Sequence, residues 1–303
     1  MVPALALFAA VHHYIFFGLD RAAIHSPAFL ASRAEGAQLK YTWRELEPTK
    51  DRYDFSAIRS DLAFLRAHGK KLFVQIQDVS FDASIVNVPA YVGVAPQYDG
   101  AEDHAKIAGW VARRWDPNVR QRFALLLRAL GREFDGRIEG VNLPETSVDF
   151  GESGKLFPSG FTCAGYAEGV IANLAALREA FPHSVVIQYA NFMPCEWLPG
   201  DNKGYLDTVF AKARAMHAGV GGPDLLPYRK GQMNHSYPRI RDLSGVVPTG
   251  IAVQEGNYDG VTIDELLKFA TEYLRVDYIF WGAQAPFYER DVLPLLARLK
   301  DSG

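Results

Sequence analysis

Two glutamates follow apolar runs directly and are the first candidates for chemistry. Glu145 comes after the run 138–143 and Pro144, and Glu255 comes after the run 249–254. A proline cannot donate to a sheet ladder, so we expect a strand to end at Pro144. Burial of a carboxylate at the end of a strand costs free energy, so such a residue is expected either to have a charged partner or to serve in binding or catalysis. One use is glycoside hydrolysis, in which one carboxyl protonates the leaving oxygen and another attacks the sugar or activates water. The alternative for each glutamate is a structural salt bridge at the rim of a barrel.

The elements that must position these glutamates are predicted from hydrophobic periodicity. Apolar runs alternate along the chain with helical patterns, and this alternation is typical of a parallel sheet. Eight such units in 303 residues predict a closed (β/α)8 TIM barrel, single domain, with long loops after the strands. An open doubly wound sheet is the alternative, but no Gly-rich phosphate turn follows the first strand. The predicted strands are 11–18, 37–43, 71–78, 138–143, 184–193, 218–225, 249–254 and 277–281. The sixth is the weakest, because 218–225 is rich in glycine.

Helices are predicted between these strands. Apolar residues at helical spacing mark 26–34, 55–69, 119–134, 166–181, 205–216, 262–274 and 292–299. Residues 104–114, within the long connection 79–117, also have helical spacing. Thr262 and Glu265 form a capping-box pattern at the start of one helix.

The barrel pattern and four short motifs resemble the large clan of retaining (β/α)8 glycoside hydrolases, which includes many β-galactosidases, cellulases, mannanases and xylanases. The motifs are the two glutamates after strands four and seven, Trp281 at the end of strand eight, and the segment 43–48 followed by 53–55. The resemblance implies that Glu145 is the acid/base, that Glu255 is the nucleophile, and that Trp281 is a platform under the sugar. The segment that begins at Trp43 resembles the turn after strand two of the clan, and Trp43 is included among the substrate-binding candidates.

One position departs from the clan, and it concerns how the sugar is held. An asparagine usually precedes the acid/base glutamate there and contacts the sugar's 2-hydroxyl, whereas Pro144 precedes Glu145 here. We expect Asn142, Gln188, Asn191 or Gln254 to replace it. Polar and aromatic side chains at strand ends suit sugar hydroxyls and rings. The full set of predicted substrate-binding residues is Asp20, Arg21, Trp43, Gln77, Asp78, Asn142, Gln188, Asn191, His235, Tyr237 and Trp281.

Composition limits the partners. The chain is 49% hydrophobic and 22% charged with a formal net charge of −3, so no electrostatic attraction to nucleic acid or to an anionic membrane is expected. No run is long enough to span a bilayer. Metal-binding motifs, a nucleophile elbow and a Walker loop are absent, so we expect neither metal nor cofactor, and a carbohydrate as the substrate.

Residues 1–10 are interpreted either as the remnant of a secretory signal or as an apolar lead-in to the catalytic barrel 11–303, with equal weight for a secreted or periplasmic and for a cytoplasmic location. Cys163 and Cys195 allow a single disulfide, but the interpretation we favour is two free, partly buried thiols.

Three functions are therefore compared. The first is a retaining glycoside hydrolase that cleaves a β-linked glycoside or polysaccharide by double displacement, with Glu145 and Glu255 as its carboxyls. The second is a barrel that binds a saccharide without cleaving it. The third is an unrelated (β/α)8 lyase or isomerase that uses a single glutamate as base. The sequence favours the first.

Overall fold

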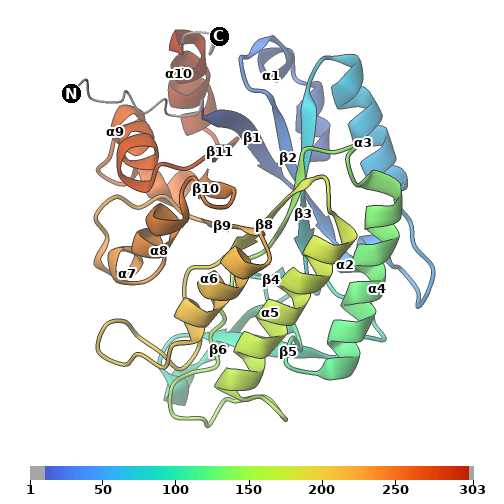
Figure 1. The fold of residues 1–303 in the computed structure, drawn as a ribbon, viewed down its shortest axis with the longest axis vertical. Coiled ribbons are helices and arrows are strands. Elements are labelled where there is room, and N and C mark those ends of the chain that lie inside the picture. The colour runs from blue at the N-terminus through green and yellow to red at the C-terminus, as the bar shows by residue number, and fades with distance from the viewer. Residues whose placement is uncertain (1–10, 300–303) are drawn as a thin grey trace.

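Eight parallel strands close into a barrel in the computed structural model, which describes residues 11–299 (Figure 1). The (β/α)8 prediction is thus confirmed, while the interpretation of residues 1–10 concerns a segment outside the described residues. Around the barrel the strands are β1 (His12–Gly18), β2 (Gly36–Thr42), β3 (Lys71–Gln77), β7 (Gly140–Leu143), β8 (Val185–Tyr189), β9 (Gly219–Gly222), β10 (Thr249–Val253) and β11 (Tyr278–Gly282), which pairs again with β1. Each lies within, or within one residue of, a strand predicted from the sequence.

The glycine-rich sixth strand, β9, owes its composition to close neighbours. A Cβ atom added at Gly219 would lie 2.6 Å from the backbone oxygens of both Pro248 and Val186, and one at Gly221 would lie 2.2 Å from the oxygen of Gly250. Larger residues cannot fit there without moving backbone, so a segment of low intrinsic strand propensity forms a strand through tertiary packing.

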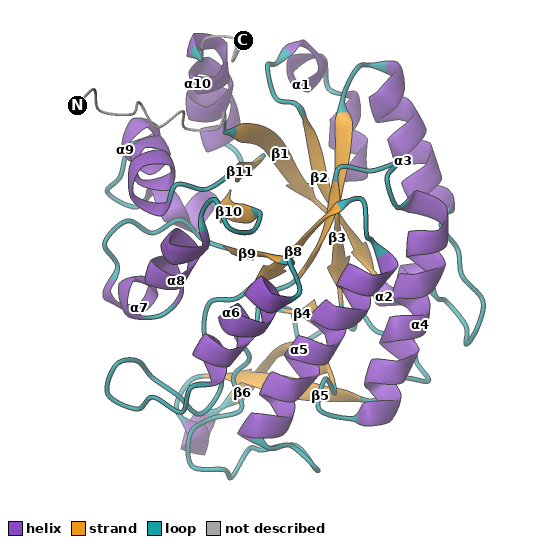
Figure 2. Cartoon of the chain, viewed as in Figure 1, coloured by secondary structure: helices purple, strands orange, loops and turns teal. Residues whose placement is uncertain are grey.

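Helices form an outer layer around the strands (Figure 2). They are α1 (Pro27–Ala31), α2 (Trp43–Leu46), α3 (Ser56–Ala67), α4 (Pro117–Phe134), α5 (Cys163–Ala180), α6 (Tyr205–Ala215), α7 (Lys230–Asn234), α8 (Ser236–Leu243), α9 (Ile263–Lys268) and α10 (Leu293–Arg298). Short 3-10 helices cover Arg21–His25, Glu102–His104 and Glu255–Tyr258, and π-helices cover Phe269–Leu274 and Tyr288–Val292. The capping box of Thr262 and Glu265 is present at the start of α9.

The prediction of a helix over 104–114 is wrong. This segment contains β6 (Lys106–Ala112), which pairs antiparallel with β4 (Val79–Ser80) and β5 (Val94–Asp99) in a small separate sheet. Gly109 lies against the backbone of Ser80, where a Cβ would come within 2.0 Å of the carbonyl oxygen. Pairing across the small sheet thus overrides the helical spacing. Because β4 follows β3 directly, this sheet lies at the carboxyl end of the barrel (Figure 1).

Two separate apolar cores fill the fold. The inner core occupies the barrel itself, where Phe73 and Phe280 pack edge to face with ring centroids 4.9 Å apart. The outer core lies between the strands and the helices. Successive residues of a strand face opposite sides, so neighbours such as Phe280 and Trp281 belong to different cores. Since the barrel is filled, a ligand can be bound only at one of its ends.

The expectation of two free cysteines is wrong. Cys163, at the start of α5, forms a disulfide with Cys195 in the loop after β8, with 6.0 Å between their Cα atoms. The two residues are 32 positions apart in the sequence and only the fold brings them together. No helix within residues 11–299 is both long enough and apolar enough to cross a bilayer.

Candidate active site

A pocket of about 90 Å³ lies at the carboxyl ends of the barrel strands. Its lining combines one carboxylate, one amine, three amides and several apolar side chains. These residues are Phe16, Lys40, Gln75, Gln77, Phe81, Pro144, Glu145, Tyr189, Pro223, Ala252 and Gln254. In a (β/α)8 barrel this is the face on which active sites are built, and the pocket is therefore the candidate active site.

Glu145 is the titratable group most affected by this environment. The pKa of Glu145 is raised to about 7, mainly by burial and to a smaller extent by the negative charge of Asp224. A hydrogen bond of 2.6 Å from Nδ2 of Asn191 to Oε2 of Glu145 opposes the rise, as do the charges of Arg114 and Lys40. A carboxyl with this pKa holds its proton near neutral pH and can give it to a leaving group.

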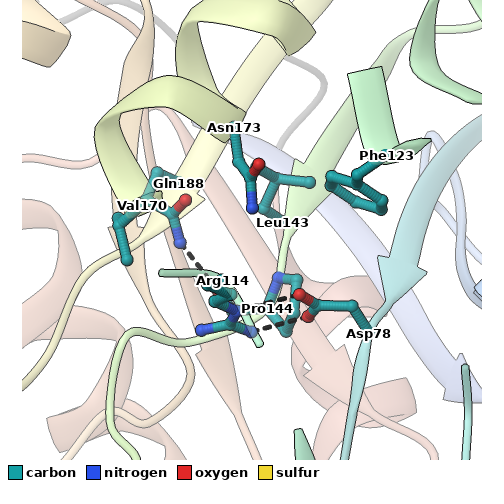
Figure 3. A pocket seen from close by; sticks show the side chains of 8 residues that line it. All are labelled: Asp78, Arg114, Phe123, Leu143, Pro144, Val170, Asn173 and Gln188. Atoms are coloured by element: carbon teal, nitrogen blue, oxygen red, sulfur yellow. Dashed lines mark hydrogen bonds and ion pairs between the residues drawn. The ribbon is translucent and has the colours of Figure 1, made fainter. Parts of the chain in front are cut away.

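A buried ion pair holds the backbone on which Glu145 sits. Arg114 is bound by both carboxylate oxygens of Asp78, at 2.6 and 2.8 Å, and donates to the backbone oxygen of Glu145 at 3.0 Å. Gln188 donates to the oxygen of Pro144 at 2.7 Å from the next strand. Figure 3 shows the two contacts that join Asp78 and Arg114. Asp78 and Gln188, predicted to bind substrate, instead position the acid.

The wall formed by β2 and β3 supplies polar groups that face Glu145. Lys40 lies with Nζ 5.1 Å from the centroid of the Phe16 ring, and burial lowers its pKa while the charge of Glu145 opposes this. Oε1 of Gln75 is buried and has no hydrogen-bond partner among the described residues. Gln77, predicted to bind substrate, lines the pocket. These side chains are available to the hydroxyls of a ligand.

Asp224 was not predicted as a site residue. It follows β9 and Pro223, and it accepts hydrogen bonds from Asn257 at 3.2 Å and from Gln254 at 3.4 Å. Burial raises the pKa of Asp224, and these two hydrogen bonds oppose the rise. A signal existed in the sequence, because a proline and a carboxylate follow β9 just as they follow β7.

Glu255 does not line the pocket. Gln254 turns into it, and Glu255 lies on the following 3-10 helix with its side chain exposed. Successive side chains of a strand point in opposite directions. Ala252 and Gln254 therefore line the pocket, whereas Val253 between them and Glu255 after them do not. The structure therefore gives no support to the expected position of Glu255 beside Glu145.

Both predicted tryptophans lie outside the pocket. Trp281 is fully buried in the outer core, where its Nε1 donates to Nδ1 of His13 at 3.0 Å. Trp43 is also fully buried and donates to Glu47 at 2.9 Å. A side chain with no exposed surface cannot serve as a platform for a sugar. The expectation for both residues is corrected: they pack the barrel against its helices.

The remaining predicted residues fall into two groups. Asn142 is buried inside the barrel and accepts a hydrogen bond from Gln38 at 3.0 Å. Asp20 is exposed in the loop after β1, and Arg21 forms ion pairs with Glu45 and Asp61 there. None of these three predicted residues lines the pocket.

His235 and Tyr237 organise the loops on the other side of the pocket. His235 is buried against the stacked rings of Phe192 and Trp197, and its Nε2 accepts from the backbone N–H of Leu198. The hydroxyl of Tyr237 donates to the backbone oxygen of Asp224 at 3.0 Å. Tyr237 thus contacts the site through Asp224 rather than through a ligand. Within residues 11–299 no three His, Cys, Asp or Glu side chains are grouped so as to hold a metal ion.

Comparisons with known proteins agree on the fold. No protein-family model and no curated protein matches the chain. Solved structures do match it over most of its length. A structure described as a glycoside hydrolase is 12% identical with a TM-score of 0.53, covering 92% of this chain and 90% of the other. The native xylanase 10B from Thermotoga maritima is 11% identical with a TM-score of 0.54, covering 90% and 83%.

A family 39 glycoside hydrolase from the gut symbiont Bacteroides cellulosilyticus WH2 is similar to the same extent. It is 13% identical with a TM-score of 0.54, and the match covers 89% of this chain and 56% of the other. At these identities the likeness concerns the path of the backbone. The chain has the (β/α)8 barrel fold that these glycoside hydrolases also have.

Proposed function

We propose that this protein is a glycoside hydrolase that cleaves a β-linked glycoside or polysaccharide in the pocket at the mouth of the barrel. The observation that carries the proposal is Glu145: it follows strand four of the barrel, lines the pocket, and has a pKa raised to about 7. A protonated carboxyl at this place can deliver a proton to the oxygen of the leaving group. The solved structures of the same fold named above include a xylanase and a family 39 glycoside hydrolase, in keeping with this proposal.

The composition of the pocket suits a sugar. Gln75, Gln77 and Gln254 offer amide donors and acceptors, and Phe16 and Phe81 offer apolar faces. Sugars present hydroxyls around rings whose faces are apolar, so this combination matches them. Phe81 has 61% of its surface exposed and stands at the edge of the pocket, where it can contact a ring that extends outward.

The mechanism we propose is retention by double displacement. Glu145 protonates the glycosidic oxygen while a second carboxylate attacks the anomeric carbon and forms a glycosyl ester. Glu145, now ionised, then removes a proton from the water that hydrolyses the ester. In retaining enzymes the two carboxyl groups lie about 5–5.5 Å apart. Glu255, the nucleophile expected from the sequence, has an exposed side chain outside the pocket lining, so we also consider a more buried carboxylate at the strand ends for this role.

The test of this function is hydrolysis of a panel of nitrophenyl β-glycosides and β-linked polysaccharides by the wild type and by Glu145→Gln. We expect the wild type to hydrolyse at least one member. Glu145→Gln should lose about 10²–10⁴-fold of that activity on substrates with poor leaving groups, the range for removal of a general acid. Binding of oligosaccharides without any turnover would instead identify a saccharide-binding barrel.

A second candidate function rests on Lys40. Its amine lines the same pocket, its pKa is lowered by burial, and no carboxylate within residues 11–299 forms a salt bridge with it. A buried amine whose pKa is lowered can condense with a carbonyl group, releasing water and forming an imine, and Glu145 would then move protons as in a lyase or isomerase. Reduction with borohydride in the presence of sugar aldehydes and ketones tests this candidate: a stable adduct on Lys40 supports it, and no adduct excludes it.

A further inference from the structure

We infer that Asp224, rather than Glu255, is the second catalytic carboxylate and attacks the anomeric carbon. The inference rests on the proposed function, because it assigns a partner to Glu145 within the same reaction. It is drawn from a hydrogen-bonded frame that occurs twice at the mouth of the barrel, once around Glu145 and once around Asp224.

The first half of this repeat is the order of residues at the strand end. β7 ends at Leu143 and is followed by Pro144 and Glu145, and β9 ends at Gly222 and is followed by Pro223 and Asp224. Both prolines line the pocket. In both places proline ends the strand and the next residue places a carboxylate at the carboxyl end of the barrel.

The second part of the repeat is a set of hydrogen bonds donated by residues at or just after the end of the next barrel strand, which is β8 for Glu145 and β10 for Asp224. Gln188 donates to the oxygen of Pro144 at 2.7 Å, and Gln254 donates to the oxygen of Pro223 at 2.8 Å. Three residues after each glutamine an asparagine binds the carboxylate. Asn191 donates to Glu145 at 2.6 Å, and Asn257 donates to Asp224 at 3.2 Å.

The asparagines are themselves fixed, so the direction of each amide is determined. Oδ1 of Asn257 accepts from the backbone N–H groups of Leu225 and Gln254, at 3.0 and 2.9 Å, which leaves Nδ2 to point at Asp224. Oδ1 of Asn191 likewise accepts from two backbone N–H groups, those of Ser147 and Phe192. A frame that holds its carboxylate in one geometry is what a catalytic group requires.

The frame around Asp224 leaves one oxygen available. Asn257 and Gln254 both bind Oδ1, and no hydrogen bond among residues 11–299 goes to Oδ2. The backbone is held separately, because the hydroxyl of Tyr237 donates to the oxygen of Asp224. Oδ2 is therefore free to act as a nucleophile.

The negative charge of Asp224 acts on the acid Glu145. Its charge raises the pKa of Glu145 beyond the rise caused by burial. Burial raises the pKa of Tyr189 in the pocket wall, and the charge of Asp224 raises it further. The ionisation of one carboxyl makes the ionisation of a neighbouring one less favourable, so one of them keeps its proton while the other is ionised. The reaction needs one protonated carboxyl as the acid and one ionised carboxyl as the nucleophile.

The reaction then balances within this chain's own groups and water. Oδ2 of Asp224 bonds to the anomeric carbon as the bond from that carbon to the leaving oxygen breaks, and Glu145 gives its proton to that oxygen. In the second half, water attacks the same carbon, Glu145 takes the proton from the water, and the ester bond to Asp224 breaks. Both carboxyl groups return to their starting states.

The experiment traps the ester in the wild-type protein. A dinitrophenyl 2-deoxy-2-fluoro-β-glycoside of the sugar that the wild type hydrolyses is added, and the tryptic peptides are analysed by mass spectrometry. The predicted tryptic peptide 215–229 contains Asp224 as its only Asp or Glu, and Glu255 lies in the separate predicted peptide 242–268. We expect the added sugar mass on 215–229; the same mass on 242–268 would overturn the inference.

Variants provide the second measurement, with turnover of a dinitrophenyl β-glycoside as the readout. Asp224→Asn should lower kcat/KM by about a thousandfold or more, as expected on loss of a nucleophile. Asp259→Asn, an exposed aspartate of the neighbouring loop, is the matched control and should retain activity. Azide should restore turnover to Asp224→Ala and give the α-glycosyl azide.

The outcomes separate this inference from the function on which it rests. A wild type that hydrolyses no glycoside overturns both. A wild type that is active while Asp224→Asn retains activity and Glu255→Gln does not overturns only the assignment of Asp224. Since the labelling experiment uses the wild type, it decides the question even if Asp224→Asn fails to fold.

Discussion

Asn191 donates a hydrogen bond of 2.6 Å from Nδ2 to Oε2 of Glu145. The contact joins the loop after β8 to the end of β7, and it stabilises the ionised form of a carboxyl whose burial favours the neutral form. The pKa of Glu145 is therefore set by a balance between burial, which raises it, and this hydrogen bond, which lowers it.

Replacing Asn191 should shift the pH dependence of activity. Without the hydrogen bond the ionised form of Glu145 is less stable, so in Asn191→Ala its pKa should rise above its present value of about 7, by roughly 1 unit. Because the protonated acid is the active form, the alkaline limb of kcat/KM should move to higher pH. The exposed Asn118 on α4 gives the control variant Asn118→Ala. A limb that stays in place or moves to lower pH would contradict this balance.

The same carboxyl should make stability depend on pH. The pKa of Glu145 is raised in the folded state from its ordinary value of 4.5 to about 7, so the folded protein binds more protons between these values and loses stability as pH rises through them. Relative to Glu145→Gln, the wild type should lose about 3 kcal/mol between about pH 4 and about pH 8. Urea denaturation of both proteins at the two pH values measures this difference, and an equal stability difference at both would refute it.

The buried ion pair behind Glu145 should be costly to break. Asp78→Ala leaves Arg114 buried without its carboxylate, and loss of one member of such a pair costs about 3–5 kcal/mol. The control is Glu133→Ala, which removes the partner of the more exposed Arg59 and should destabilise the protein much less, because exposed ion pairs contribute little. Chemical denaturation measures the free energy of unfolding of both variants. Similar losses of this free energy would show that the buried ion pair of Arg114 and Asp78 does not stabilise the protein more than an exposed pair does.

The disulfide should stabilise the folded protein by reducing the conformational entropy of the unfolded chain. It closes a loop over 32 positions, and the chain-entropy relation gives about 4 kcal/mol for a loop of this length. The double variant Cys163→Ala with Cys195→Ala should therefore unfold at a lower denaturant concentration than the oxidised wild type. Reduced wild type should match the double variant; if reduction changes nothing, the two cysteines are not bonded in solution.

The sequence predicted the barrel because most of its units carry a local pattern. Runs such as 71–78 and 249–254 are apolar and end at polar residues, and the following helices have regular apolar spacing. The exception, residues 104–114, shows the limit of this method. Its helical spacing is overridden by antiparallel pairing of β6 with β4 and β5, and Gly109 of β6 lies against the backbone of Ser80 in β4, a contact that no local pattern records.

The site was predicted less completely, since it depends on which face of a strand looks inward. Glu145 could be predicted because a proline fixes where its strand ends. The core to which Trp281 belongs could not be predicted. A shift of one residue along the strand moves a side chain from the inner core, which contains Phe280, to the outer core, which contains Trp281. Asp224 was missed although it repeats the proline–carboxylate order, because the glycines before it obscure the strand.

The central claim is that Glu145 is the proton donor, and the leaving group tests it most directly. The measurement is kcat/KM of the wild type and of Glu145→Gln on a phenyl and a dinitrophenyl β-glycoside of the same sugar. A phenolate needs the proton and a dinitrophenolate does not. We predict that Glu145→Gln loses about 10²–10⁴-fold on the phenyl glycoside and stays close to the wild type on the dinitrophenyl glycoside. Equal losses on both substrates, or no loss on either, would contradict the account.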